Sequence, residues 1–136
     1  MNQMTDSDLV SKSFNRCKDN PRFMPRFYEI FIKSSPKIAP YFAKTNMARQ
    51  HSLLKEGVEL LIMFGLGSLK AKSYMAKMGE LHDRKHINVP PELYPFWVNS
   101  MVATVRDIDP EFTPEIEASW RRHLQKGIDR ITSAYE

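Results

Sequence analysis

The chain has 136 residues, the usual size of one domain, and its 42% hydrophobic and 26% charged residues exclude a disordered or fibrous protein. Its 20 basic and 16 acidic residues give a net charge of +4 without a basic tail or stripe, which argues against nucleic-acid binding. The single cysteine, the polar first residues and the shortness of the longest apolar run (residues 60–66) predict a cytoplasmic protein that is neither secreted nor membrane-spanning.

Apolar residues recur at helical spacing through the first half of the chain. The first helix is expected from Asp6 or Ser7 to about residue 18, and a second, with a broad aromatic face, begins after Pro21. A proline-rich turn over residues 36–42 follows it. Thr45 or Asn46 can cap a third helix that reaches about residue 64.

Three more helices are expected in the second half. One covers residues 69–82, and the Pro90-Pro91 pair opens the next, which closes at Asp109-Pro110. Thr113 caps the last helix, which can run to residue 135. Because no stretch alternates with period two, the fold class is predicted to be all-α, with six to seven helices in a single domain over residues 1–136.

His82 stands at the end of the fourth helix, on or beside its apolar face. A histidine in such a place is most often a hydrogen-bonded core residue. Other residues of the chain favour a functional role for His82. Tyr28 lies on the aromatic face of the second helix, and Phe42 ends the turn after Pro36. The third helix places Gln50 or His51 one turn before an apolar leucine.

Several of these residues follow an order known from one family. The chain resembles bacterial single-domain globins, flavohaemoglobins and the globin domains of globin-coupled sensors from about residue 14 to residue 131. Met78-Gly79 before His82 is similar to the pattern that precedes the iron-binding histidine of globins. The other matches are Phe27-Tyr28, Phe31, Pro36, Ile38, Pro40, Phe42, Val89, Pro91, Tyr94, Pro95 and Trp120.

The resemblance implies a globin fold that holds haem b (iron protoporphyrin IX) between the third and fourth helices. His82 would be the metal ligand, and its second ring nitrogen would donate to a backbone carbonyl or a hydroxyl. Phe42 would pack on the porphyrin. The apolar walls would come from Leu54, Val58, Met78, Val89, Trp97 and Met101.

The opposite side of the haem would need a hydrogen-bond donor for a bound gas. Tyr28 is the preferred donor, and Gln50 is the second candidate. The register of the third helix leaves an alternative, in which His51 or Leu54 faces the iron instead. His86, Arg49, Arg84 and Lys85 would lie near a haem propionate.

Simpler interpretations remain for some of these residues. Tyr28 can be an ordinary core tyrosine, and His82 with His86 can chelate zinc, although no third ligand is evident. His123 is expected in solvent, on the charged side of the last helix beside Arg121 and Arg122.

Three functions are therefore open. The first is reversible binding of oxygen, carbon monoxide or nitric oxide for gas sensing or storage, with a homodimer or a signalling partner left undecided. The second is nitric oxide dioxygenation, which needs a separate reductase because the chain has no Gly-x-Gly-x-x-Gly cofactor motif. The third is a haem-free globin-like module for protein interaction.

Overall fold

The computed structural model describes residues 4–135, and within that range it contains helices and connecting turns but no strand. The six α-helices are α1 (Asp6–Cys17), α2 (Phe23–Ser34), α3 (Met47–Gly65), α4 (Leu69–Leu81), α5 (Tyr94–Ile108) and α6 (Pro114–Thr132). Two short 3₁₀ helices, η1 (Ala39–Phe42) and η2 (Pro91–Leu93), precede α3 and α5. The predicted all-α class is confirmed, and within residues 4–135 none of the helices is long and apolar enough to cross a membrane.

Side-chain caps explain where four of the helices begin. Thr5 and Asp8 form a reciprocal capping box at the start of α1. The side chains of Asn46, Ser68 and Thr113 each accept a hydrogen bond from a backbone N–H in the first turn of α3, α4 and α6. These contacts satisfy backbone donors that have no partner within the helix.

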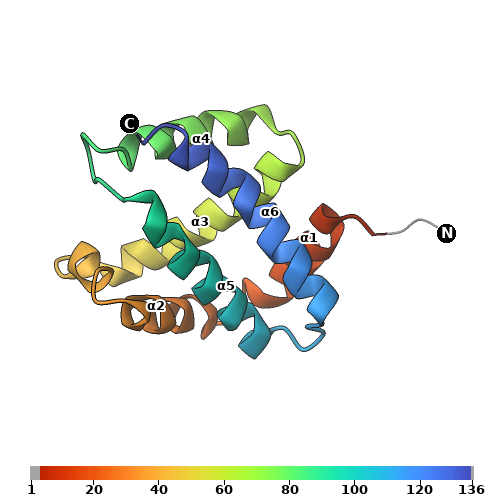
Figure 1. Ribbon diagram of the computed structural model, residues 1–136. Coiled ribbons are helices and arrows are strands. Elements are labelled where there is room, and N and C mark those ends of the chain that lie inside the picture. Colours follow the sequence, from red (N-terminus) through yellow and green to blue (C-terminus); the bar gives the residue numbers. More distant parts are fainter. Residues whose placement is uncertain (1–3, 136) are drawn as a thin grey trace.

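The helices pack in two crossed groups around one apolar cluster. Helix α2 lies against α5, α1 lies against α6, and α6 also contacts α3 and α4 (Figure 1). Each of the six helices contributes fully or almost fully buried side chains to the cluster, among them Phe14, Phe27, Val58, Met75 and Trp120. In Figure 1 α4 runs along the top of the molecule, α3 crosses its middle, and α5 runs diagonally down beside α2 at the lower left.

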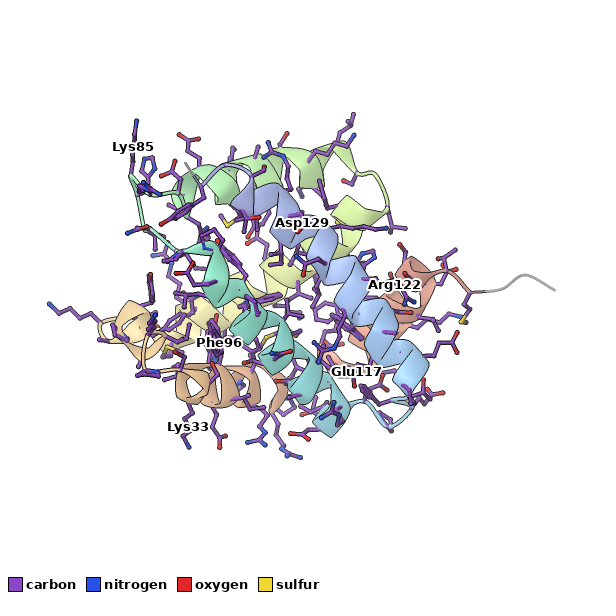
Figure 2. The ribbon with its side chains drawn as sticks, viewed as in Figure 1. Lys33, Lys85, Phe96, Glu117, Arg122 and Asp129 are labelled. Carbon is purple, nitrogen blue, oxygen red and sulfur yellow. The ribbon has the colours of Figure 1, made fainter. Side chains whose placement is uncertain are left out.

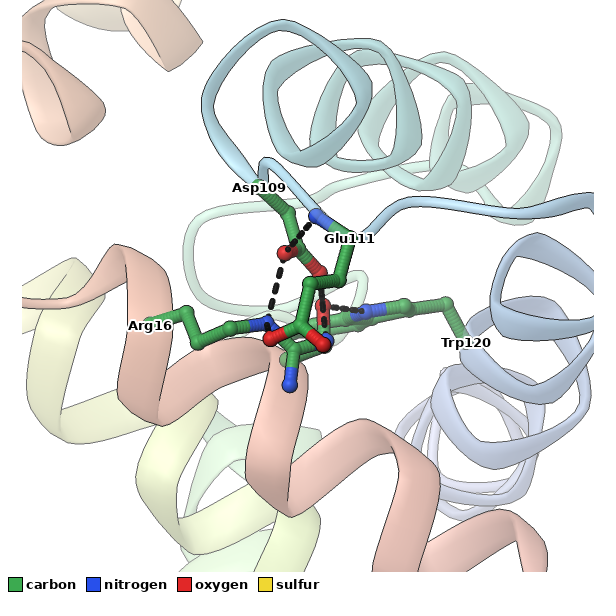
Figure 3. Close-up of polar contacts among 5 residues, drawn as sticks. Arg16, Asp109, Glu111 and Trp120 are labelled. Atoms are coloured by element: carbon green, nitrogen blue, oxygen red, sulfur yellow. Dashed lines mark hydrogen bonds and ion pairs between the residues drawn. The ribbon is translucent and has the colours of Figure 1, made fainter.

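A polar network fixes the α5–α6 corner to α1 (Figure 3). The buried Asp109 carboxylate accepts hydrogen bonds from Ser13 Oγ at 2.6 Å and from both Nε and Nη2 of Arg16, at 2.6 and 2.9 Å. Ser13 Oγ in turn accepts from the indole N–H of Trp120. Burial acts to raise the pKa of Asp109, but the bonds from Arg16 and Ser13 outweigh it and lower that pKa. The carboxylate therefore stays charged and joins three helices.

Two predicted helix boundaries were wrong by a few residues. The helix expected to open at Pro90-Pro91 is divided into η2 and α5, because a proline ring at residue 95 fits only in the first turn of an α-helix. Helix α6 ends at Thr132 and not at Tyr135. After the helix, the amides of Ala134 and Tyr135 bond to carbonyls three residues back, which closes the chain into a tighter turn.

His123 corrects another sequence-based expectation. Its side chain is fully buried, not solvated, because residue 123 lies on the apolar stripe of α6 together with Trp120 and Leu124. Its Nε2 lies 3.1 Å from the Ile62 carbonyl of α3, and its Nδ1 lies 3.4 Å from Ser7 Oγ of α1. A Cβ atom at Gly65 would overlap the imidazole, so glycine is required there. In the sequence His123 follows Arg121 and Arg122, and these charged neighbours led to the wrong expectation that it is exposed.

The burial of His123 predicts a pH-dependent stability. Burial lowers the pKa of His123 below its usual 6.5, so the unfolded chain binds a proton more readily than the folded one. The buried, neutral His123 therefore contributes fully to the free energy of unfolding above pH 6.5. This contribution declines as the pH falls below 6.5 towards the lower pKa of the folded state. Urea unfolding at pH 7.5 and 5.0 should show a lower midpoint at pH 5.0. The difference should shrink in His123→Asn, and an equal difference in both proteins would remove His123 as its cause.

Candidate functional site

A cavity of about 520 Å³ lies between the helices, a volume within the range of small-molecule and cofactor sites. Side chains from α2, α3, α4, α5 and α6 line it, together with η1 and the segment that connects α4 to α5. Most of these side chains are apolar. The polar exceptions include Tyr28, Gln50 and His82, which come from three different helices or helix ends.

His82 is held in one ring orientation at the end of α4. Its Nδ1 lies 2.7 Å from the carbonyl oxygen of Met78, one turn earlier. Because a carbonyl can only accept, Nδ1 carries the ring proton, and the free lone pair is on Nε2. A neutral imidazole in this state can coordinate a metal ion through Nε2.

Gly79 explains how α4 comes to lie so close to the C-terminal end of α6. A Cβ atom at residue 79 would lie 2.9 Å from the Cβ of Ala134 and 3.3 Å from the Ile131 carbonyl. Real Cβ atoms essentially never approach another atom to 2.9 Å, so a larger residue would push α4 outward. Glycine three residues before His82 thus sets the position of the imidazole at the cavity wall.

Tyr28 and Gln50 form a hydrogen-bonded pair on the cavity wall. The Gln50 amide Nε2 donates to the Tyr28 hydroxyl oxygen at 3.0 Å, so the phenolic proton is free to donate elsewhere. Tyr28 is 4% exposed, and burial raises the pKa of its hydroxyl to about 12, against a smaller lowering effect of Gln50. The hydroxyl therefore remains a neutral donor at physiological pH.

A second hollow, of about 560 Å³, lies far from these residues at the α5–α6 corner. Its arginines, Arg106 and Arg121, are paired with Glu117 at 2.9 and 3.1 Å. This hollow is also more open to solvent than the central cavity. The central cavity is the better candidate for a functional site.

Comparison with known proteins decides the family. No family model matches the chain, and no curated protein matches it either. Among solved structures, the chain is similar to a protein of Pseudomonas aeruginosa PAO1 that is described as structurally highly homologous to a human haemoglobin. The two chains are 33% identical, the match covers 96% of this chain and 98% of the other, and the TM-score is 0.92. The chain belongs to the bacterial single-domain globins. The predicted globin fold is thereby confirmed.

The globin cavity contains most of the side chains that the sequence analysis proposed for it. Beside Tyr28, Gln50 and His82, its wall includes Phe42, Leu54, Val58, Met78, Val89 and Trp97. The ring of Phe42 contacts Tyr28 and Phe31 edge to face, with centroids 5.4 and 5.9 Å apart. These contacts fix the aromatic ring at the junction of η1 and α2.

Three proposed residues lie off the cavity wall. Met101 is fully buried in the core one turn beyond Trp97. His51 does not line the cavity but stacks on the Tyr28 ring, with centroids 5.6 Å apart, because Gln50 occupies the inward position of that turn. His86 lies in the segment after α4, where its Nδ1 pairs with Asp83 Oδ1 at 2.7 Å.

The basic residues expected near a propionate also lie off the wall of this globin's cavity. The guanidinium of Arg84 lies over the Tyr135 ring, 5.3 Å from its centroid, and Arg49 is exposed in the first turn of α3. Lys85 extends into solvent from the connection between α4 and α5 (Figure 2).

Sequence reasoning missed the rim of the globin cavity. Four lining residues are unusually exposed for their size, namely Tyr41 (37%), Leu53 (45%), Leu81 (43%) and Ile87 (45%). They come from η1, α3, α4 and the segment after α4. They are scattered along the sequence, and no local pattern could show that they line the same cavity.

Proposed function

We propose that this globin holds haem b in the central cavity, with His82 as the iron ligand, and that it binds a diatomic gas reversibly. The proposal rests on the arrangement of polar groups in this cavity. A mostly apolar cavity brings together an imidazole with a free Nε2 and the hydrogen-bonded pair of Tyr28 and Gln50.

The residues present fit a porphyrin. A flat, largely apolar group would cover Tyr41, Leu53, Leu81 and Ile87, which otherwise expose apolar surface to water around one opening. Phe42, Val58 and Trp97 offer aromatic and aliphatic contacts deeper in the cavity. The donor set also fits, because neutral imidazole is the usual axial ligand of globin haem.

Haem, when bound, would supply an iron that can take a gas molecule as a ligand. His82 would hold this iron, and the Met78 carbonyl fixes the tautomer and ring plane of the imidazole. Tyr28 would donate its phenolic hydrogen to a polarised gas molecule, while the Gln50 amide holds the hydroxyl oxygen in place. The apolar walls exclude water from the pocket.

Reversible binding of oxygen, carbon monoxide or nitric oxide would suit gas sensing or storage. A polar donor such as Tyr28 favours a ligand that gains negative charge when bound, which oxygen does and carbon monoxide does much less. Among these gases, we therefore propose oxygen as the one that the Tyr28–Gln50 pair holds best.

Titration of haem into the haem-free protein tests this proposal. We expect a Soret absorption band that grows linearly and stops at one haem per chain. Quenching of tryptophan fluorescence should end at the same ratio, because Trp97 lines the cavity. A band that keeps rising without an end point, as it does for haem adsorbed on a protein surface, would contradict the proposal.

A further inference from the structure

The segment between α4 and α5 begins directly after His82 and is folded back on the end of α4. The amides of Ile87, Asn88 and Val89 donate to the carbonyls of Leu81, Asp83 and His82, at 3.0, 2.9 and 3.0 Å. Asn88 has a φ of +58°, the left-handed region that few residues other than glycine adopt. The segment is therefore a tight, self-bonded loop attached to the proposed iron ligand.

Two tyrosines from distant parts of the chain hold this loop at a single residue. The Tyr41 hydroxyl of η1 donates to the backbone carbonyl of Asn88 at 2.7 Å. The Tyr135 hydroxyl, beyond the end of α6, donates to the Asn88 side-chain oxygen, also at 2.7 Å. Both distances have the usual value for an O–H···O hydrogen bond, so each tyrosine makes a normal, fully formed bond.

The Tyr41 bond joins two walls of the cavity. Tyr41 lies beside Phe42 on the η1 wall, whereas Asn88 lies between Ile87 and Val89, which line the cavity from the segment after α4. Tyr41 and Ile87 are also two of the four exposed residues at the rim. A group of porphyrin size that leaves through this rim must separate the two walls, and the bond resists that separation.

We propose that the Tyr41–Asn88 hydrogen bond is a latch across the cavity rim that slows the loss of haem, with Tyr135 holding Asn88 in the conformation that receives it. This inference rests on the proposed haem-binding function. The hydroxyl groups of both tyrosines bond to Asn88 and not to His82. Both therefore act as positioning residues, which hold the loop that follows His82.

The rate of haem transfer to an excess of a tight-binding acceptor protein measures the latch. In Tyr41→Phe, which keeps the ring and removes the donor, we expect haem loss about 3- to 10-fold faster, as for one lost hydrogen bond. Gln125→Ala is the matched control. It removes one exposed side-chain hydrogen bond, that of Gln125 Nε2 to Asp129 Oδ1 at 2.7 Å on α6, from a residue that does not line the cavity, so its rate should stay within about twofold of the wild type.

Asn88→Gly separates the two tyrosines. Glycine adopts the positive φ and keeps the carbonyl that Tyr41 uses, but it removes the acceptor of Tyr135. Asn88→Gly and Tyr135→Phe should therefore have similar effects, and the double variant should be no faster than either one. Additive effects would show that Tyr135 does not act through Asn88 and would overturn that part of the proposal.

Amide hydrogen exchange in the haem-free protein gives a second readout, independent of haem. Exchange at residues 87–89 should be faster in Tyr41→Phe than in the wild type. If the wild type takes up one haem and Tyr41→Phe loses it at the wild-type rate, the latch is wrong while the proposed function stands. If the wild type takes up no haem, both fail.

Discussion

Replacement of His82 by alanine is expected to weaken haem binding by more than about 100-fold, since even residues that only orient a metal ligand change affinity by 10- to 100-fold. The substitution removes the one imidazole on the cavity wall, whose Nε2 is free because Nδ1 bonds to the Met78 carbonyl. Haem titration followed by Soret absorbance measures the change. The variant should also lose the spectrum of a histidine-ligated ferrous haem.

His86→Ala is the matched control for His82→Ala. His86 is only four residues away, but it pairs with Asp83 outside the cavity, so its loss should leave haem affinity within about threefold. Far-ultraviolet circular dichroism should show that both variants keep their helices. In His82→Gly, free imidazole should restore the spectrum by occupying the vacated space. Tight haem uptake by His82→Ala would contradict the assignment of the iron ligand.

Replacement of Tyr28 by phenylalanine should speed oxygen dissociation about 10- to 100-fold, because a hydrogen bond to a charged acceptor contributes about 1.5–3 kcal/mol. The hydroxyl is available because Gln50 donates to its oxygen and leaves its proton free. Stopped-flow displacement of oxygen by carbon monoxide measures the rate. Carbon monoxide dissociation should change much less, because that ligand gains little negative charge.

Tyr74→Phe is the control for the loss of a hydroxyl from the same cavity. Tyr74 also lines the cavity, but its hydroxyl makes no bond to Gln50, and the oxygen off-rate should be close to that of the wild type. In Gln50→Leu, the Tyr28 hydroxyl loses its partner but keeps its proton, so the off-rate should rise less than in Tyr28→Phe. An unchanged oxygen off-rate in Tyr28→Phe would remove Tyr28 from this role.

Local signals in the sequence were sufficient for the helices. Prolines near helix starts, capping residues such as Asn46 and Thr113, and apolar spacing of three and four residues act within one or two turns, so they can be recognised without the fold. The end of α6 was misplaced because the turn after Thr132 depends on three-residue hydrogen bonds that no single residue type signals.

Features that depend on packing between distant segments could not be predicted in the same way. His123 is buried because α1, α3 and α6 meet at its ring, while its sequence neighbours are charged. Which of Gln50 and His51 faces inward depends on how α3 is rotated against α2. Asn88 bonds to Tyr41 and to Tyr135, each 47 positions away in the sequence, and no local pattern predicts either contact.

The absorption spectrum of the ferrous protein, recorded without and then with carbon monoxide, tests haem binding through His82 most directly. We expect a five-coordinate spectrum that converts to a six-coordinate one with a sharper, shifted Soret band at one carbon monoxide per chain. The same experiment on His82→Ala should not give this conversion. A protein that stays colourless after incubation with haem, or a wild-type spectrum that His82→Ala reproduces, would contradict the assignment.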